Sequence, residues 1–225
     1  MASGQRTQPL QIAPLGHVTP LPQLERARWE RRARLLAWGG NAWHLIEFGI
    51  AIGAGIAAGS IALIGFGADS LIEGLAGFVI VWLFTGARLG SEAAERRAQE
   101  LVAVSYFILA AYVAVESVRT LLGGHHPKTS WIGVGLAAVT APTMPLLARA
   151  KRKVGNKLYS SATVSEASQN MICAYLSVAL LVGLLGNALL GWWWSDPAAA
   201  LVIAAVALRE GRESWRGELC CDDCC

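Results

Sequence analysis

The chain has 225 residues, of which 54% are hydrophobic and only 16% are charged, and its mean hydropathy is +0.44. A net charge of +3 is too small to indicate a nucleic-acid partner, and the hydropathy is too high for an ordinary soluble domain. Nine tryptophans and 24 glycines agree with this, since Trp gathers at membrane interfaces and Gly is frequent in membrane helices. We therefore predict an all-α polytopic membrane protein with one transmembrane domain.

The N-terminal part of the chain is polar and rich in proline over its first 24 residues, without the apolar core of a signal peptide. We predict a disordered tail over 1–24. The basic stretch 25–37 is predicted to be an amphipathic helix that lies at the inner membrane surface and leads into the first span. The transmembrane domain is predicted to cover 25–211, and a Cys-rich C-terminal tail to cover 212–225.

Six apolar segments follow in chain order. The predicted membrane spans are about Trp38–Ala58, Ile61–Gly86, Leu101–Leu122, Trp131–Leu147, Leu158–Leu190 and Pro197–Leu208. Pro142 and Pro145 predict a kink or an early end of the fourth span. Residues 89–100 and 148–157 are predicted to be charged loops, and Asp196 is suited to start the sixth helix.

Six spans place both termini on one side of the membrane, and the basic residues divide in the same way. Of the 19 Lys and Arg residues, only Arg119 and Lys128 are left for the opposite side. The positive-inside rule then makes both termini cytoplasmic. A count of five or seven spans would break this division.

The second span carries two acids, Asp69 and Glu73, four residues apart. Helical geometry places their side chains on one face, about 6 Å apart along the axis. An ionisable group inside a membrane span costs on the order of 3 kcal/mol or more, so it marks a polar pathway or a binding site. The two acids have no obvious basic partner in the sequence.

The fifth span carries Gln169 and Cys173 on one helical face. If this face meets the second span, Asp69, Glu73, Gln169 and Cys173 form one four-point cluster. Carboxylates with a thiolate suit Zn²⁺ in tetrahedral geometry, whereas an amide oxygen suits harder ions such as Mn²⁺ or Co²⁺. The competing interpretation is that these groups only hydrogen-bond between helices and hold the bundle together.

The first span has a second polar face, formed by His44 and Glu47. We interpret these side chains, together with Glu166 on the face of Cys173 in the fifth span, as a candidate secondary metal site or proton path. A hydrogen bond from Glu47 to hydroxyl groups of the second span is the structural alternative.

Other polar groups lie near the ends of the predicted spans. Glu116 is predicted to form a local ion pair with Arg119. His125 and His126 are either solvated or collect ions. Four cysteines end the chain as a candidate site of cytosolic metal capture, with thioacylation or no role as the alternatives: Cys220, Cys221, Cys224 and Cys225.

Three stretches resemble the cation diffusion facilitator family. The stretch GSIALIGFGADSLIE resembles its first hairpin, SSATVSEASQNMICAYLS its fifth span, and GWWWSDPAAALVIA its entry to the sixth. The resemblance covers about 38–211 and points to a divergent, transmembrane-protein-163-like branch. It implies a transport site that includes Asp69, Glu73, Gln169 and Cys173. Typical members have His and Asp at the last two positions, so the chain departs from the family there.

The resemblance implies a transporter that exports a divalent transition metal from the cytosol by proton-coupled alternating access. We expect Zn²⁺ as the ion, with Mn²⁺, Co²⁺ and Fe²⁺ as alternatives, and no further cofactor. The expected partners are the metal ion, protons, the lipid bilayer of the plasma membrane and a second copy of the chain in a homodimer, without nucleic acid. An enzyme is not expected, because the sequence contains no Ser/His/Asp set, HExxH motif or phosphate-binding glycine loop. The alternative function is a non-transporting membrane scaffold or partner-binding protein whose acids only organise helix packing.

Overall fold

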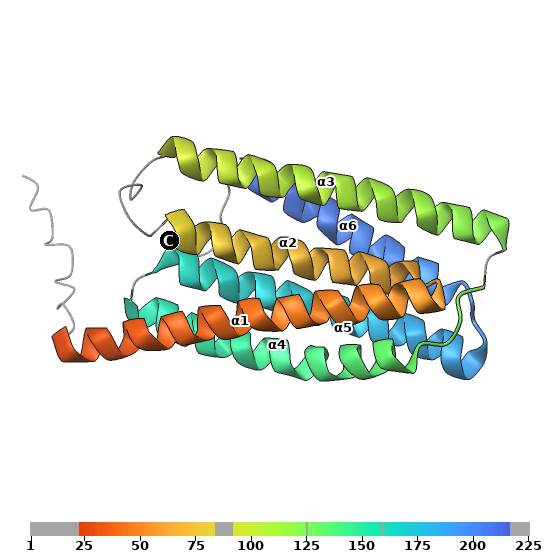
Figure 1. Ribbon diagram of the computed structural model, residues 1–225, viewed down its shortest axis with the longest axis horizontal. Helices are drawn as coiled ribbons and strands as arrows, with labels where there is room; N and C mark the ends of the chain where they lie inside the picture. Colours follow the sequence, from red (N-terminus) through yellow and green to blue (C-terminus); the bar gives the residue numbers. More distant parts are fainter. Residues whose placement is uncertain (1–22, 84–91, 125, 159, 217–225) are drawn as a thin grey trace, which may run out of the picture.

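The computed structural model describes residues 23–83, 92–124, 126–158 and 160–216, and these residues form helices and no strand. The helices are α1 Gln23–Ala58, α2 Ile61–Leu83, α3 Glu92–Gly123, α4 Trp131–Leu158, α5 Ser161–Leu190 and α6 Ser195–Arg216. Consecutive helices run in opposite directions along one long axis (Figure 1). We call the end where α1 begins and α6 ends the terminal end, and the opposite end the hairpin end.

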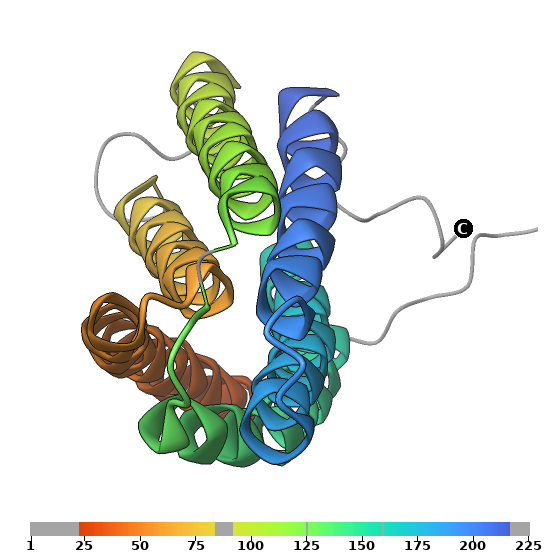
Figure 2. The ribbon, with the colours of Figure 1, turned by 90° about the vertical axis from the view of Figure 1, so that its right-hand side faces the viewer.

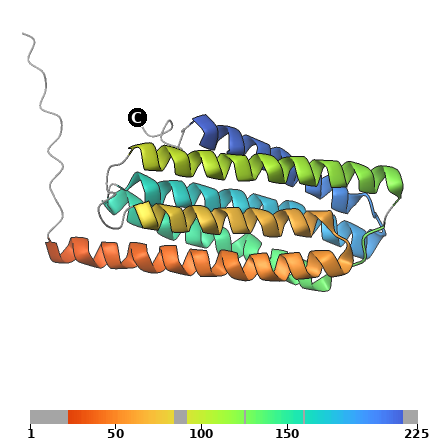
Figure 3. The same cartoon turned by 45° about the horizontal axis from the view of Figure 1, so that its top comes forward.

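The helices enclose a shared core. Seen from the hairpin end, α2 lies between α1 and α3, and α5 and α6 lie on the other side of the bundle (Figure 2). Contacts join α2 to α1, α3, α5 and α6, so it is the central helix. At the terminal end, α1 extends past the other helices (Figure 3). The acids of α2 are thus held where several helices converge.

Among the described residues, three helices are long and apolar enough to cross a membrane, judged by length and composition alone: Glu100–Gly123 in α3, Trp131–Leu158 in α4 and Thr163–Leu190 in α5. Large apolar side chains are exposed on the outside of the bundle, among them Ile56, Ile108 and Val182. Such a surface is unfavourable in water and favourable in contact with the apolar core of a bilayer. The all-helical membrane architecture is confirmed. That all six helices cross, with both termini cytoplasmic, stays a prediction.

Two predicted loops are wrong. Residues 148–157 form the last turns of α4, which continues through Pro142 and Pro145 rather than ending early. The prolines remove two backbone donors, but the buried face that includes Met144, Ala148 and Lys151 packs on beyond them. In the same way α3 begins at Glu92, inside the loop predicted over 89–100. The predicted lead-in 25–37 is helical and joins the first span without a break.

Serine residues begin three of the helices. In each case the serine hydroxyl accepts a hydrogen bond from the backbone N–H three residues later, which satisfies a donor that the helix leaves unpaired. The three N–H to Oγ pairs are Leu63 to Ser60 at 3.1 Å, Gly133 to Ser130 at 3.2 Å and Thr163 to Ser160 at 3.3 Å. These caps fix where α2, α4 and α5 start.

Asp196 joins the starts of α2 and α6 at the hairpin end. It lies in the first turn of α6, as predicted, and its buried carboxylate also accepts hydrogen bonds from α2. The donors are the Ser60 hydroxyl at 2.5 Å, the Ile61 N–H at 3.1 Å and the Ala62 N–H at 3.5 Å. The negative charge also favours this position, because a helix N-terminus carries partial positive charge. Asp196 therefore fixes the register between the two helices.

Candidate metal site

Asp69 and Glu73 both lie inside the bundle and are almost completely buried. Asp69 Oδ2 and Glu73 Oε2 are buried without a hydrogen-bond partner among the described residues. A buried carboxylate oxygen is normally paired, because its desolvation is costly. A bound proton or metal cation would therefore stabilise these two oxygens.

His44 of α1 faces Glu73 across the core. Its Nδ1 atom lies 3.3 Å from Glu73 Oε2 and 3.4 Å from Glu47 Oε2. The same Nδ1 atom is buried and makes no hydrogen bond within the described part of the chain. A protonated Nδ1 would form ion pairs with these carboxylates, whereas an unprotonated ring nitrogen and a carboxylate oxygen repel each other at this distance unless a cation lies between them.

Cys173 of α5 completes a three-residue group. One potential ligand atom from each of His44, Glu73 and Cys173 lies within 4.8 Å of the other two, and all three residues are buried. A tetrahedral zinc ion holds such N, O and S atoms about 3.3 to 3.7 Å apart. The observed spacing of His44 and Glu73 is already within this range, so the group fits a zinc-like ion.

Two members of the predicted four-point cluster belong to this group. Glu73 and Cys173 come together, as the facing of the second and fifth spans requires. Asp69 lies one helical turn nearer the hairpin end, and Gln169 lies about one turn nearer the terminal end, where its side chain is half-buried. The ligand role of Asp69 and Gln169 stays a prediction, whereas His44, predicted as a secondary residue, is part of the group.

Glu47 has hydrogen-bond partners on two neighbouring helices. Its fully buried carboxylate accepts a hydrogen bond from the Thr140 hydroxyl of α4 and a longer one, 3.5 Å, from the Ser70 hydroxyl of α2. The bond to a second-span hydroxyl, which was the structural alternative for Glu47, is present, and the bond to α4 was not predicted. Glu47 thus connects α1, α2 and α4 beside the metal group.

Lys151 is the main residue that the sequence analysis missed. Its ammonium is buried, 3.0 Å from Glu166 Oε2 and 3.1 Å from Asn170 Oδ1. It is also close enough to act electrostatically on Glu73. No ion pair joins Lys151 to Asp69 or Glu73 among the described residues, so Lys151 does not contradict the expectation that the two acids lack an obvious basic partner. The signal was present in the spacing of Met144, Ala148 and Lys151, which puts the lysine on the buried face of α4.

Glu210 of α6 is a second residue that was missed. It acts electrostatically on Asp69 and Glu73, and its Oε1 atom is buried without a hydrogen-bond partner among the described residues. In the sequence, Glu210 appeared to belong to the charged segment after the sixth span. Because α6 continues to Arg216, Glu210 instead lies on a helix that packs against α2.

The remaining candidates lie away from the metal group. Glu116 forms the predicted ion pair with Arg119, at 2.8 Å. His126 stacks on Trp193 with ring centroids 4.9 Å apart. His125 lies outside the described residues, and so do the four cysteines of the predicted capture site, which fall within 217–225.

The family model of the cation efflux transmembrane domain matches residues 42–216. The chain belongs to the cation efflux family. This match confirms the resemblance to cation diffusion facilitators and covers His44, Glu73, Cys173 and Lys151. A search of curated proteins finds no match to the sequence. Members of the cation efflux family are membrane transporters of metal cations and not enzymes, which supports a cation transporter here.

Proposed function

We propose that this cation efflux protein exports Zn²⁺ from the cytosol in exchange for protons, by alternating access around the group of His44, Glu73 and Cys173. The observation that supports zinc is the buried, unbonded pair of His44 Nδ1 and Glu73 Oε2, 3.3 Å apart, with a thiol beside it. Nitrogen and sulfur ligands favour Zn²⁺ over Mn²⁺, which prefers oxygen. Co²⁺ and Fe²⁺ are the nearest competitors.

The proposed ligands differ from those of typical cation diffusion facilitators, and the side chains of this chain explain the difference. Typical cation diffusion facilitators have His and Asp at two fifth-span positions where this chain has Gln169 and Cys173. An amide is a poor zinc ligand, and His44 from α1 can supply the missing imidazole. Asp69 also carries an unbonded buried oxygen, and it is the next ligand in this proposal toward the hairpin end.

Proton exchange follows from the same carboxylates. When the metal leaves, the buried oxygens of Asp69 and Glu73 need another positive charge, and protons can supply it. The orientation in the membrane rests on the division of basic residues, which favours cytoplasmic termini, and export from the cytosol is what membership of the cation efflux family suggests. Residence in the plasma membrane is part of the same proposal.

The test is metal uptake into proteoliposomes that contain the purified full chain and a pH gradient. Zn²⁺, Mn²⁺, Co²⁺ and Fe²⁺ are compared, and Glu116→Gln is the control because Glu116 lies in a surface ion pair. We expect zinc flux that requires Glu73 and is coupled to proton movement. Folded protein without flux of any ion would favour the scaffold alternative, in which buried acids only join helices, as Glu47 does.

A further inference from the structure

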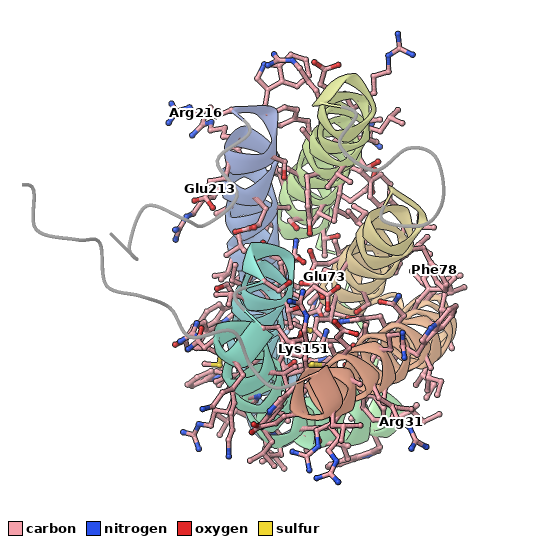
Figure 4. All side chains as sticks on the ribbon, turned by 90° about the vertical axis from the view of Figure 1, so that its left-hand side faces the viewer. Arg31, Glu73, Phe78, Lys151, Glu213 and Arg216 are labelled. Carbon is pink, nitrogen blue, oxygen red and sulfur yellow. The ribbon has the colours of Figure 1, made fainter. Side chains whose placement is uncertain are left out.

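Lys151 differs from its basic neighbours on α4. Arg149, Arg152 and Lys153 are exposed, whereas only 3% of Lys151 is exposed, the one buried Lys or Arg among the described residues. Figure 4, viewed from the terminal end, shows Lys151 and Glu73 among the helices, and Arg31 and Arg216 on the outside. Burying an ammonium is costly even when it is paired, so this position needs an explanation.

The contacts of Lys151 place it one helical turn from the metal group, on the terminal side. Asn170 precedes Cys173 by three residues on α5, which begins at the terminal end. Gly40, beside the ammonium, precedes His44 by four residues on α1, which begins at the same end. Each step is about 4.5 to 6 Å along a helix. The ammonium thus lies between the metal group and the terminal end.

The opposite side of the metal group is packed with apolar side chains. Leu63 and Phe66 of α2, Val113 of α3, Leu180 of α5 and Ile203 of α6 are completely buried in the hairpin half. Beyond Asp69, the buried hydroxyls of Ser117 and Ser177 already donate to carbonyl groups of their own helices, so a hydrated cation would meet few free polar partners there. On the terminal side, Lys151, Asn170 and Glu166 form a polar connection, and the Glu166 side chain is 13% exposed.

We propose that Lys151, held by Glu166 and Asn170, is a gate on the terminal side of the metal site. A divalent cation that enters from this side meets a buried positive charge within one turn of its ligands, and the two charges repel strongly in a medium of low polarity. The ammonium must therefore swing outward for the ion to enter, and Glu166, one turn nearer the terminal end than Asn170, is the partner that can guide it. In the absence of metal, the same ammonium offsets the charge of the acids. The role of Lys151 in metal entry rests on the proposed function. Its blocking of the path from the terminal end to Cys173 does not.

Cys173 is a native reporter for this gate. Replacing the four tail cysteines with serine in the full chain leaves Cys173 as the sole thiol. Sealed vesicles are exposed to a small, membrane-impermeant methanethiosulfonate on one side or the other, and modification of Cys173 is followed by mass spectrometry. Labelling of the native tail cysteines identifies the terminal side.

We expect Lys151→Ala to raise the rate of Cys173 modification at least tenfold from the terminal side and to leave it unchanged from the hairpin side. Lys151→Arg should keep the slow rate, and Lys153→Ala, on the exposed face of the same helix, is the matched control. Equal rates in Lys151→Ala and Lys153→Ala would overturn the gate. A rise from both sides would also overturn it, since that is what general loosening of the bundle produces.

A glycine pair tests the gate if Lys151→Ala fails to fold. A methyl group at Gly40 would lie 2.9 Å from Lys151 Nζ, whereas one at Gly39 would meet nothing within 4 Å. Gly40→Ala should displace the flexible ammonium and speed terminal-side modification several-fold, and Gly39→Ala should not. Identical rates for the two variants would contradict the gate.

Zinc separates the gate from the proposed function. If His44, Glu73 and Cys173 bind the ion, saturating Zn²⁺ should slow modification of Cys173 in the Lys151→Ala variant at least fivefold. A gate effect without zinc protection would leave the gate in place and refute zinc binding at this group. Zinc protection without any effect of Lys151 would refute the gate alone.

Discussion

The hairpin end of the bundle and the region around Glu73 differ in how their buried acids are paired. In the hairpin half, Asp196 accepts three hydrogen bonds from the start of α2, and its surroundings are tightly packed apolar side chains. Nearer the terminal end, Asp69, His44 and Glu73 each keep a buried atom without a hydrogen-bond partner. A buried acid with hydrogen-bond partners stabilises a fold, whereas buried acids without such partners are available to bind a cation. The difference separates the structural carboxylate from the functional ones.

The largest expected effect is at Glu73. Glu73→Gln should reduce the initial rate of zinc uptake into proteoliposomes more than a hundredfold, because the change removes a ligand and a proton carrier together. The midpoint temperature of thermal unfolding in detergent should be unchanged or slightly raised, since a buried unpaired charge is also removed. Uptake at the unmodified rate would place the site elsewhere, and Glu116→Gln should transport normally.

The opposite pattern is expected at Asp196. Asp196→Ala should lower the free energy of unfolding by about 2 kcal/mol, because Ser60 and the first N–H groups of α2 lose their acceptor. Zinc uptake per folded molecule should be retained. Denaturation in detergent gives the first quantity, and Asp196→Asn, which keeps one acceptor oxygen, should lose less. Unchanged stability of the alanine variant would mean that Asp196 has no structural role, and the contrast with the acids around Glu73 would be lost.

The effect at Cys173 is expected to depend on the metal. Cys173→Ser should weaken the apparent affinity for Zn²⁺ about tenfold and that for Mn²⁺ much less, because the softer ion gains more from sulfur. Ser168→Ala on the same helix is the control, since its hydroxyl donates to the Val164 carbonyl of its own helix. Uptake is measured for both ions in the same vesicles. Equal losses for the two ions would mean that the thiol only packs.

The smallest effect is expected from the C-terminal tail. Deleting Cys220–Cys225 should raise the zinc concentration needed for half-maximal uptake two- to threefold and leave the maximal rate nearly intact. The tail follows α6 at the terminal end, so its thiols would meet the ion before the membrane path. Loss of transport at saturating zinc would instead make the tail part of the translocation machinery.

The amino-acid sequence by itself determined the helical class, the hairpins and the faces of the individual helices. These depend on local features: apolar segments, the serines that begin helices, and spacings of three or four residues. The pair of Asp69 and Glu73, and the face that bears Cys173, could be read in this way because each lies within one helix.

Only the tertiary structure decided which faces meet. Periodicity gives the direction of a side chain around its own helix, but not the helix that it contacts. His44 joins Glu73 and Cys173 because α1, α2 and α5 converge there. Lys151, which reads as part of a basic loop, is buried because packing against α5 keeps α4 helical past its prolines. Likewise, Asp196 caps α2 as well as starting its own helix because α6 packs against α2, bringing together residues 136 positions apart in the chain.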